Sequence, residues 1–181
     1  MRDELIRDAQ LLTRDEYVDR YSYVFFAYGF GGEGGGLQEY RMSYLPPQGR
    51  AHLNSLTQIM PITDDNPESK PLPDTILPVT KSERSPYRDR ISIGRAAICD
   101  MVLAAPAVSK LHAHFLMEPG GAWSVRDARS TNGTFVNGVR LQEEVRVSIR
   151  PGDRLRFAYC DGRFLDAGAL YDLLASSPPR R

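Results

Sequence analysis

The sequence of 181 residues has few cysteines, no long apolar run and no net charge. Its two cysteines, Cys99 and Cys160, lack the spacing of metal ligands, and we expect two separate, reduced and buried side chains. The longest apolar-aromatic run, at 21–30, is too short to cross a bilayer and favours a buried strand. The charged first residues differ from a signal peptide. We therefore expect a cytoplasmic protein without a membrane partner.

Positive and negative residues balance over the chain but not within its halves. Residues 1–85 hold nine Lys or Arg and thirteen Asp or Glu, which gives −4, whereas residues 86–181 hold fourteen and ten, which gives +4. A mildly basic half favours an anionic partner. The excess is too small and too scattered to indicate nucleic acid, so we expect no nucleic-acid partner.

The N-terminal part has helical and strand patterns in succession. Residues 2–12 and 14–21 are expected helices, and Thr13 followed by Glu16 is the pattern of a capping box before the second one. The apolar stretch 22–30 is expected to be a strand.

Glycine and proline then dominate the sequence. The stretch GFGGEGGG at 29–36 predicts a flexible loop, after which 37–44 has the character of a second strand. Eight of the thirteen prolines lie between positions 46 and 86, and 61–75 reads as an extended linker. We expect 1–60 to be an extension of helices and strands that either packs on the rest of the chain or forms a separate interaction surface.

The character of the sequence changes after Ile76. Short apolar runs alternate with turn residues, which is typical of an all-β sandwich; the runs are ILPV, RISIG, MVL, HAHFLM, AWSV, TFV, RVSI and RLRFAY. A helical pattern, DAGALYDLL, follows at 166–174 with Asp166 as a possible cap. We expect this second domain at 76–176 and a short tail at 177–181.

Four ordered stretches in this half carry a recognisable pattern. They are Gly94-Arg95, VSKLHAHF at 108–115, WSVRD at 123–127, and STNGTFVNG at 130–138. In this order and spacing they resemble the forkhead-associated (FHA) domain, a phosphothreonine-binding module, over roughly residues 76–165; nothing in 1–75 takes part. The resemblance implies an all-β, FHA-type sandwich of about 10–11 strands, here with an N-terminal α+β extension and a short C-terminal helix.

The resemblance also implies a phosphopeptide site on loops at one end of the sandwich. Arg95 would grip two phosphate oxygens with its planar guanidinium, and Ser109 would offer its hydroxyl and its backbone N–H. Lys110 stands where the family more often has arginine, and it supplies a point charge rather than a bidentate fork. Thr131 would bond the phosphate, and Asn132 would hold the peptide backbone.

The second Asn-Gly pair and three further residues are expected to build the site. Asn137 would mainly turn the chain at the far end of the short strand 134–136, with some ligand contact, and we include it among the binding residues. Asn132 and Gly133 can take positive φ in the ligand loop. Gly94 and Gly133 are expected to shape the backbone of the site. His112 is expected to be a buried residue whose ring connects the site loops.

These residues favour an adaptor over an enzyme. Ser109 and His112 superficially suggest a nucleophile and a base, but the surrounding sequence lacks a nucleophile-elbow pattern, so we expect no catalytic activity and no cofactor or metal. We expect binding to phosphothreonine proteins downstream of a Ser/Thr protein kinase. The alternative is a phosphate-independent scaffold. The oligomeric state stays open.

The loop before Ser109 bears on which peptides are bound. The uncharged stretch AAPAV at 104–108 predicts no strong demand for an acidic residue three positions after the phosphothreonine.

Besides the adaptor and the scaffold, a weaker hypothesis is self-regulation. One of four threonines would be phosphorylated and would dock in the site of its own or a neighbouring chain; these are Thr57, Thr63, Thr75 and Thr80.

Overall fold

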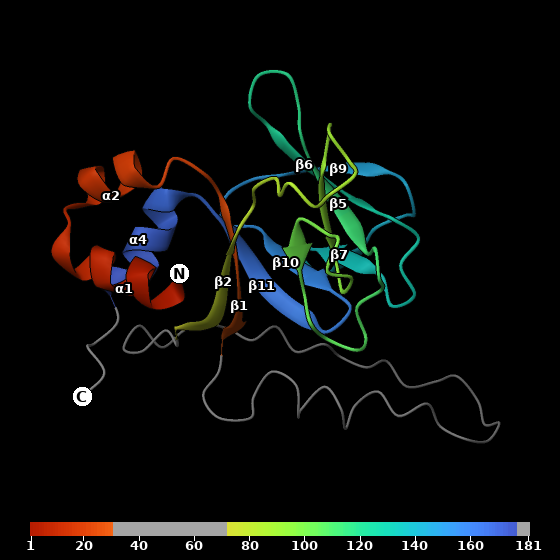
Figure 1. Ribbon diagram of the computed structural model, residues 1–181, viewed down its shortest axis with the longest axis horizontal. Helices are drawn as coiled ribbons and strands as arrows, with labels where there is room; N and C mark the ends of the chain where they lie inside the picture. Colours follow the sequence, from red (N-terminus) through yellow and green to blue (C-terminus); the bar gives the residue numbers. More distant parts are fainter. Residues whose placement is uncertain (31–71, 177–181) are drawn as a thin grey trace.

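Two β-sheets face each other in the computed structural model, which describes residues 1–30 and 72–176 (Figure 1). The six-stranded sheet has the order β2 (Pro73–Pro78), β1 (Phe25–Phe30), β11 (Cys160–Leu165), β10 (Arg154–Phe157), β7 (Thr134–Val136) and β8 (Val139–Arg140). The five-stranded sheet has the order β4 (Met101–Val102), β3 (Ile91–Gly94), β5 (Ala113–Met117), β6 (Trp123–Asp127) and β9 (Arg146–Ile149). The paired strands run antiparallel, except that β3 and β4 are parallel. The prediction of an all-β sandwich of 10–11 strands is confirmed.

Aromatic side chains fill the space between the two sheets. The rings of Phe115 from one sheet and Phe164 from the other stack with centroids 5.8 Å apart, and Phe157 meets Phe26 edge to face at 5.2 Å. All four side chains are fully buried. Because alternate residues of a strand point to one face, the inward-facing rings of both sheets meet in one core.

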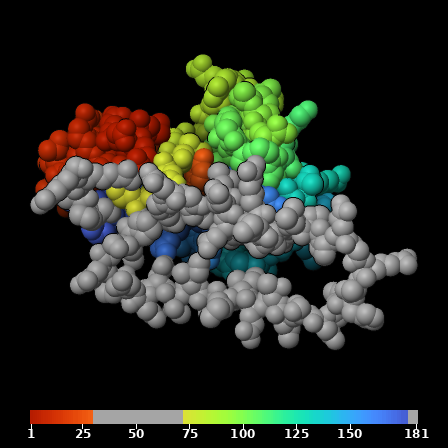
Figure 2. Space-filling view, turned by 90° about the horizontal axis from the view of Figure 1, so that it is seen from below, coloured from red at the N-terminus to blue at the C-terminus, as the bar shows by residue number. Residues whose placement is uncertain are grey.

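Three helices cover part of the outer face of the six-stranded sheet (Figure 1). They are α1 (Arg2–Leu11), α2 (Arg14–Arg20) and α4 (Ala167–Ala175), and the N-terminal helices, red in Figure 2, lie at one end of the molecule. A second core forms beneath them and includes Leu5, Tyr17, Phe25, Leu165 and Leu170. The predicted capping box is present, since the Thr13 side chain accepts from the Glu16 N–H and the Glu16 carboxylate accepts from the Thr13 N–H. None of the described helices is long and apolar enough to span a membrane.

Strand β1 belongs to the sandwich itself. It pairs with β11 on one side and with β2 on the other, so part of the predicted extension 1–60 lies inside the six-stranded sheet. Strand β2 begins at Pro73, and the last residues of the predicted linker 61–75 therefore lie in a paired strand. Proline is tolerated there because β2 is an edge strand. The boundaries at 60 and 76 stay predictions.

Several sequence expectations lie outside the described residues. They are most of the loop at 29–36, the strand at 37–44, the linker up to residue 71, the tail 177–181, and the candidate phosphorylation sites Thr57 and Thr63.

Candidate binding site

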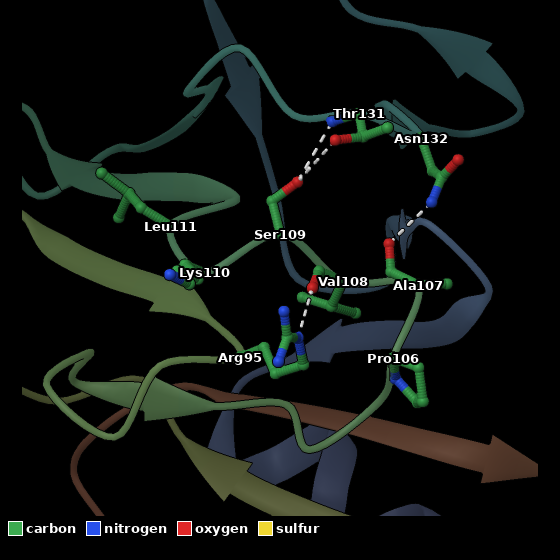
Figure 3. A pocket seen from close by; sticks show the side chains of 9 residues that line it. All are labelled: Arg95, Pro106, Ala107, Val108, Ser109, Lys110, Leu111, Thr131 and Asn132. Carbon is green, nitrogen blue, oxygen red and sulfur yellow. Dashed lines mark hydrogen bonds between the residues drawn. The ribbon is translucent and has the colours of Figure 1, made fainter.

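Three loops at one end of the sandwich enclose an open pocket of about 410 Å³ (Figure 3). The first loop follows β3, the second precedes β5 and the third follows β6. The pocket is lined by Arg95, Pro106, Ala107, Val108, Ser109, Lys110, Leu111, Thr131 and Asn132. Five of the six residues that the sequence assigned to ligand binding thus meet in one place, although they come from parts of the chain up to 37 positions apart.

Gly94 lets the first two loops approach closely. The backbone N–H of Arg95 donates to the Ser109 carbonyl at 2.9 Å, and that of Ala96 donates to the Lys110 carbonyl at 3.0 Å. A Cβ atom on Gly94 would collide with the Lys110 carbonyl group and would lie 3.0 Å from the Cα of Leu111. The requirement for glycine here comes from this approach of two backbones rather than from a positive φ.

Arg95 projects from the end of β3 along the floor of the pocket (Figure 3). Its Nε donates to the Val108 carbonyl at 3.1 Å, which fixes the plane of the guanidinium. Within residues 1–30 and 72–176, no carboxylate lies within 4.0 Å of Arg95 or Lys110. Both side chains are exposed, so two cationic groups at this pocket are available to an anion.

Ser109 and Thr131 join the opposite walls of the pocket through their hydroxyls. The Ser109 Oγ accepts from the Thr131 backbone N–H at 3.1 Å and lies 3.4 Å from the Thr131 Oγ1 (Figure 3). Two hydroxyls and two cationic side chains therefore line the same space. None of the nine lining residues has a carboxylate, so the pocket offers donors without a competing anion.

Asn132 connects the loop after β6 to the loop before β5. Its Nδ2 donates to the Ala107 carbonyl at 2.7 Å (Figure 3). No hydrogen bond within residues 1–30 and 72–176 uses its Oδ1, so the amide keeps an acceptor as well as a second hydrogen to donate. Of the two residues expected to take positive φ, Gly133 does so at +80°, whereas Asn132 does not.

His112 ties two of the loops together from below. The imidazole is fully buried, its Nδ1 accepts from the Ser109 backbone N–H at 3.2 Å, and its Nε2 lies 3.1 Å from the Gly133 carbonyl oxygen. An acceptor at Nδ1 and a carbonyl facing Nε2 require the neutral tautomer with hydrogen on Nε2. Burial lowers the pKa of His112, which favours the same neutral form. The Ser109 hydroxyl bonds Thr131 and not the imidazole, so the two are not paired as nucleophile and base.

Asp127 anchors the loop after β6, and the sequence reasoning missed its role. Its carboxylate accepts from the Ser130 N–H at 2.9 Å, from the Ser130 Oγ at 2.6 Å and from the Thr134 Oγ1 at 2.6 Å. Burial alone would raise the pKa of Asp127, but these hydrogen bonds outweigh it and lower the pKa below its usual value. The available signal was an Asp followed three residues later by Ser, the spacing of a local side chain-to-backbone turn.

Asn137 does not lie in the pocket. It turns the chain between β7 and β8 with φ of +49°. Its Nδ2 donates to the Asp153 carboxylate at 2.9 Å, and its Oδ1 accepts from the Arg154 N–H at 2.9 Å. These bonds hold two turns together at the end of β7 away from Thr131 and Asn132. The structure therefore places the first Asn-Gly pair beside the pocket and the second one at the other end of a three-residue strand.

Comparison with known proteins identifies the segment that carries the pocket. Residues 91–158 match the family model of the FHA domain. Over 76 residues the chain is 38% identical to an ABC transporter ATP-binding/permease protein of Mycobacterium tuberculosis, which covers 42% of this chain and 8% of the relative. It is 36% identical over 76 residues to the DNA damage response protein kinase DUN1 of Saccharomyces cerevisiae, which covers 39% of this chain and 15% of the relative. The chain thus spans less than a fifth of either relative.

A solved structure is similar over about half of the chain. It is the N-terminal FHA domain of Rad53p from S. cerevisiae in complex with a phosphothreonine peptide, with 20% identity and a TM-score of 0.43 over 51% of this chain and 86% of that one.

Proposed function

Because residues 91–158 form an FHA domain, we propose that its pocket binds phosphothreonine peptides and that the protein is an adaptor in Ser/Thr kinase signalling. The observation that carries this proposal is the grouping of Arg95 and Lys110 around the hydroxyls of Ser109 and Thr131. A phosphate dianion presents three acceptor oxygens and needs donors on several sides. The pocket supplies these donors without a carboxylate among its lining residues.

Each side chain has a distinct role in this proposal. The guanidinium of Arg95, held by the Val108 carbonyl, presents its terminal nitrogens to two phosphate oxygens. Lys110 adds a point charge, and the two hydroxyls bond the remaining oxygen. Asn132 pairs with the peptide backbone beside the phosphorylated residue.

The preference for threonine over serine rests on one methyl group. Pro106, Ala107 and Leu111 add apolar surface to the lining. Burying a methyl group contributes about 0.8 kcal/mol, which corresponds to a preference of about fourfold. A larger preference requires that phosphoserine leave a void.

Three further parts of the proposal come from the sequence. We propose that the protein has no catalytic activity of its own, that a Ser/Thr kinase acts upstream of it, and that it works in the cytoplasm. A scaffold that binds partners without phosphate is the competing function, and it differs from the adaptor in one measurable respect: it does not need Arg95.

Fluorescence anisotropy with a phosphothreonine peptide library tests the proposal. The unphosphorylated and phosphoserine libraries serve as ligand controls. Arg95→Ala should weaken phosphothreonine binding about 10- to 100-fold, as expected for a lost bidentate charged contact. Arg150→Ala removes the same charge from an exposed position at the other end of the sandwich and should leave binding unchanged. Phosphate-independent binding, or equal binding by Arg95→Ala, would refute the proposal and favour the scaffold.

A further inference from the structure

Arg140 lies on the outer face of the six-stranded sheet in a row with Phe135 and Arg156. Phe135 of β7 pairs with Arg140 of β8 on one side and with Arg156 of β10 on the other. Directly opposed residues of antiparallel strands point to the same face, so the three side chains are neighbours. The guanidinium of Arg156 lies 3.5 Å from the centre of the Phe135 ring, a close cation–π contact. We call these three residues the arginine strip.

The strip ends at the loop that carries Asn132. A Cβ atom on Gly133 would lie 2.7 Å from the Nε of Arg140 and 3.1 Å from its Cζ. The guanidinium of Arg140 therefore rests against the backbone of Gly133, the residue directly after pocket-lining Asn132. The absence of a side chain at Gly133 is what lets a cation lie so close to the pocket.

Arg140 also has no counter-ion in the described part of the chain. It is exposed, and no carboxylate lies within 4.0 Å of it in residues 1–30 and 72–176. Several other arginines of the sandwich are paired: Arg154 bonds Asp161, and Arg126 lies 3.3 Å from Glu144. Arg156 is held over an aromatic ring. Arg140 is thus an exposed guanidinium that lies beside the pocket loop and is open to an anion.

We propose that Arg140 is a specificity residue that binds the carboxylate of an acidic side chain flanking the phosphothreonine. The proposal rests on the proposed function, because the phosphate in the pocket brings the flanking residues to the strip. Arg156 and Phe135 extend the same surface, so a second acidic residue or an aromatic one further along the peptide meets a matching partner.

This acidic preference is separate from the prediction made for the loop 104–108. That loop is uncharged and comes from the segment before β5, whereas Arg140 comes from β8. Arg140 is exposed, so its contribution is that of a partly screened ion pair, about three- to tenfold in the dissociation constant. Raising the ionic strength should reduce this preference, since exposed ion pairs are screened by salt.

The test uses the full chain and phosphothreonine peptides in which Asp is placed, one position at a time, on both sides of the phosphothreonine. Dissociation constants are measured for the wild type, Arg140→Ala, Arg140→Glu and the control Arg150→Ala. We expect one or two positions where Asp strengthens wild-type binding three- to tenfold over Ala. Arg140→Ala should lose that gain yet still bind the all-Ala phosphopeptide, and Arg140→Glu should prefer Lys at the same position.

The outcomes separate this inference from the proposed function. If the wild type binds no phosphothreonine peptide, the proposed function fails and the inference fails with it. If the wild type binds but shows no acidic preference, or if Arg140→Ala and Arg140→Glu keep the wild-type preference, only the inference is overturned. Circular dichroism of each variant shows whether it is folded, and the all-Ala phosphopeptide shows whether its pocket is intact.

Discussion

The Nε2 of His112 lies 3.1 Å from the carbonyl oxygen of Gly133, and this contact joins the loop before β5 to the loop of Thr131 and Asn132. The same ring receives the Ser109 backbone N–H through Nδ1. A single buried, neutral side chain therefore sets the distance between two of the loops that line the pocket.

Replacing His112 should loosen the pocket and destabilise the fold together. His112→Ala leaves the Ser109 backbone N–H without its partner, removes one of two hydrogen bonds to the Gly133 carbonyl and opens a cavity, so we expect the free energy of unfolding to fall by about 2–5 kcal/mol. Urea denaturation measures this loss. His112→Gln, whose amide offers both an acceptor and a donor, should recover part of it. If His112→Ala were as stable as the wild type, the hydrogen bonds described here would not hold the loops.

Two buried histidines predict a loss of stability in mild acid. Burial, with Arg126 and Arg90 nearby, lowers the pKa of His114 to about 4, and burial lowers that of His112. In the unfolded chain both titrate near 6.5, so above that pH both states are neutral and stability is constant. As the pH falls from about 6.5 towards 4, the unfolded state binds protons first and stability decreases, by about 3 kcal/mol for His114 alone.

Chemical denaturation at a series of pH values checks this profile. A His114→Gln variant should have a flatter dependence between pH 6.5 and 4 than the wild type, whatever its stability at neutral pH. Glu144 and Asp89 face the same ring and oppose the shift, so they limit its size. An equally steep profile in the variant would exclude His114 as the source.

Asp127 should matter for binding although it does not line the pocket. Asp127→Asn removes the negative charge and one acceptor oxygen from a set of three hydrogen bonds, which should cost about 1.5–3 kcal/mol of stability. The loop after β6 would be less ordered, so phosphopeptide binding should weaken as well. Denaturation and anisotropy on the same variant give both numbers.

A matched control comes from an exposed ion pair of the helical side. Asp172→Asn breaks the contact with Arg14, in which both side chains are more than half exposed. Such pairs contribute about 0–1 kcal/mol, and this one is far from the pocket loops. Equal effects of the two Asp→Asn changes would argue against a special role for Asp127.

Gly94→Ala should damage the site through the backbone. The added methyl group would meet the backbone of Lys110 and Leu111, neither of which can rotate away, so the two loops must separate. We expect a loss of about 2–4 kcal/mol in stability and weaker phosphopeptide binding. Gly120→Ala is the comparison: it has φ of +94° but nothing within 4 Å, so only the backbone strain of about 1–2 kcal/mol applies, and binding should persist. Thermal denaturation and anisotropy distinguish the two.

Local signals explain what the sequence predicted well. The capping box at Thr13 and Glu16 and the cap at Asp166 depend on neighbouring residues only, and both are present. Short apolar runs bounded by turn residues located most strands, since both signals are local in the sequence. The pocket residues were assigned through the resemblance of four ordered sequence stretches to the FHA domain, in which the ligand is expected on loops at one end of the sandwich.

What the sequence did not predict depends on register between strands. The row of Arg140, Phe135 and Arg156 exists because β7 pairs with both β8 and β10 in one particular alignment, and no local pattern specifies this. Strand β11 begins with Cys-Asp-Gly, which reads as a turn, yet Gly162 is required there because a Cβ would meet the Phe26 ring and the Ala27 carbonyl of β1.

The position of β1 in the six-stranded sheet bears on how much of the chain the complete sandwich requires. The recognisable segment ends at residue 158, before β11 begins, and it contains neither β1 nor β2. Yet β11 lies in the sheet interior, where β10 and β1 flank it. The segment that matches the family model is therefore shorter than the sandwich that contains it. A segment cut at residue 158 would keep every pocket side chain and leave one edge of β10 unpaired, so in this protein the part that carries the pocket and the part that completes the sheet are different lengths of chain.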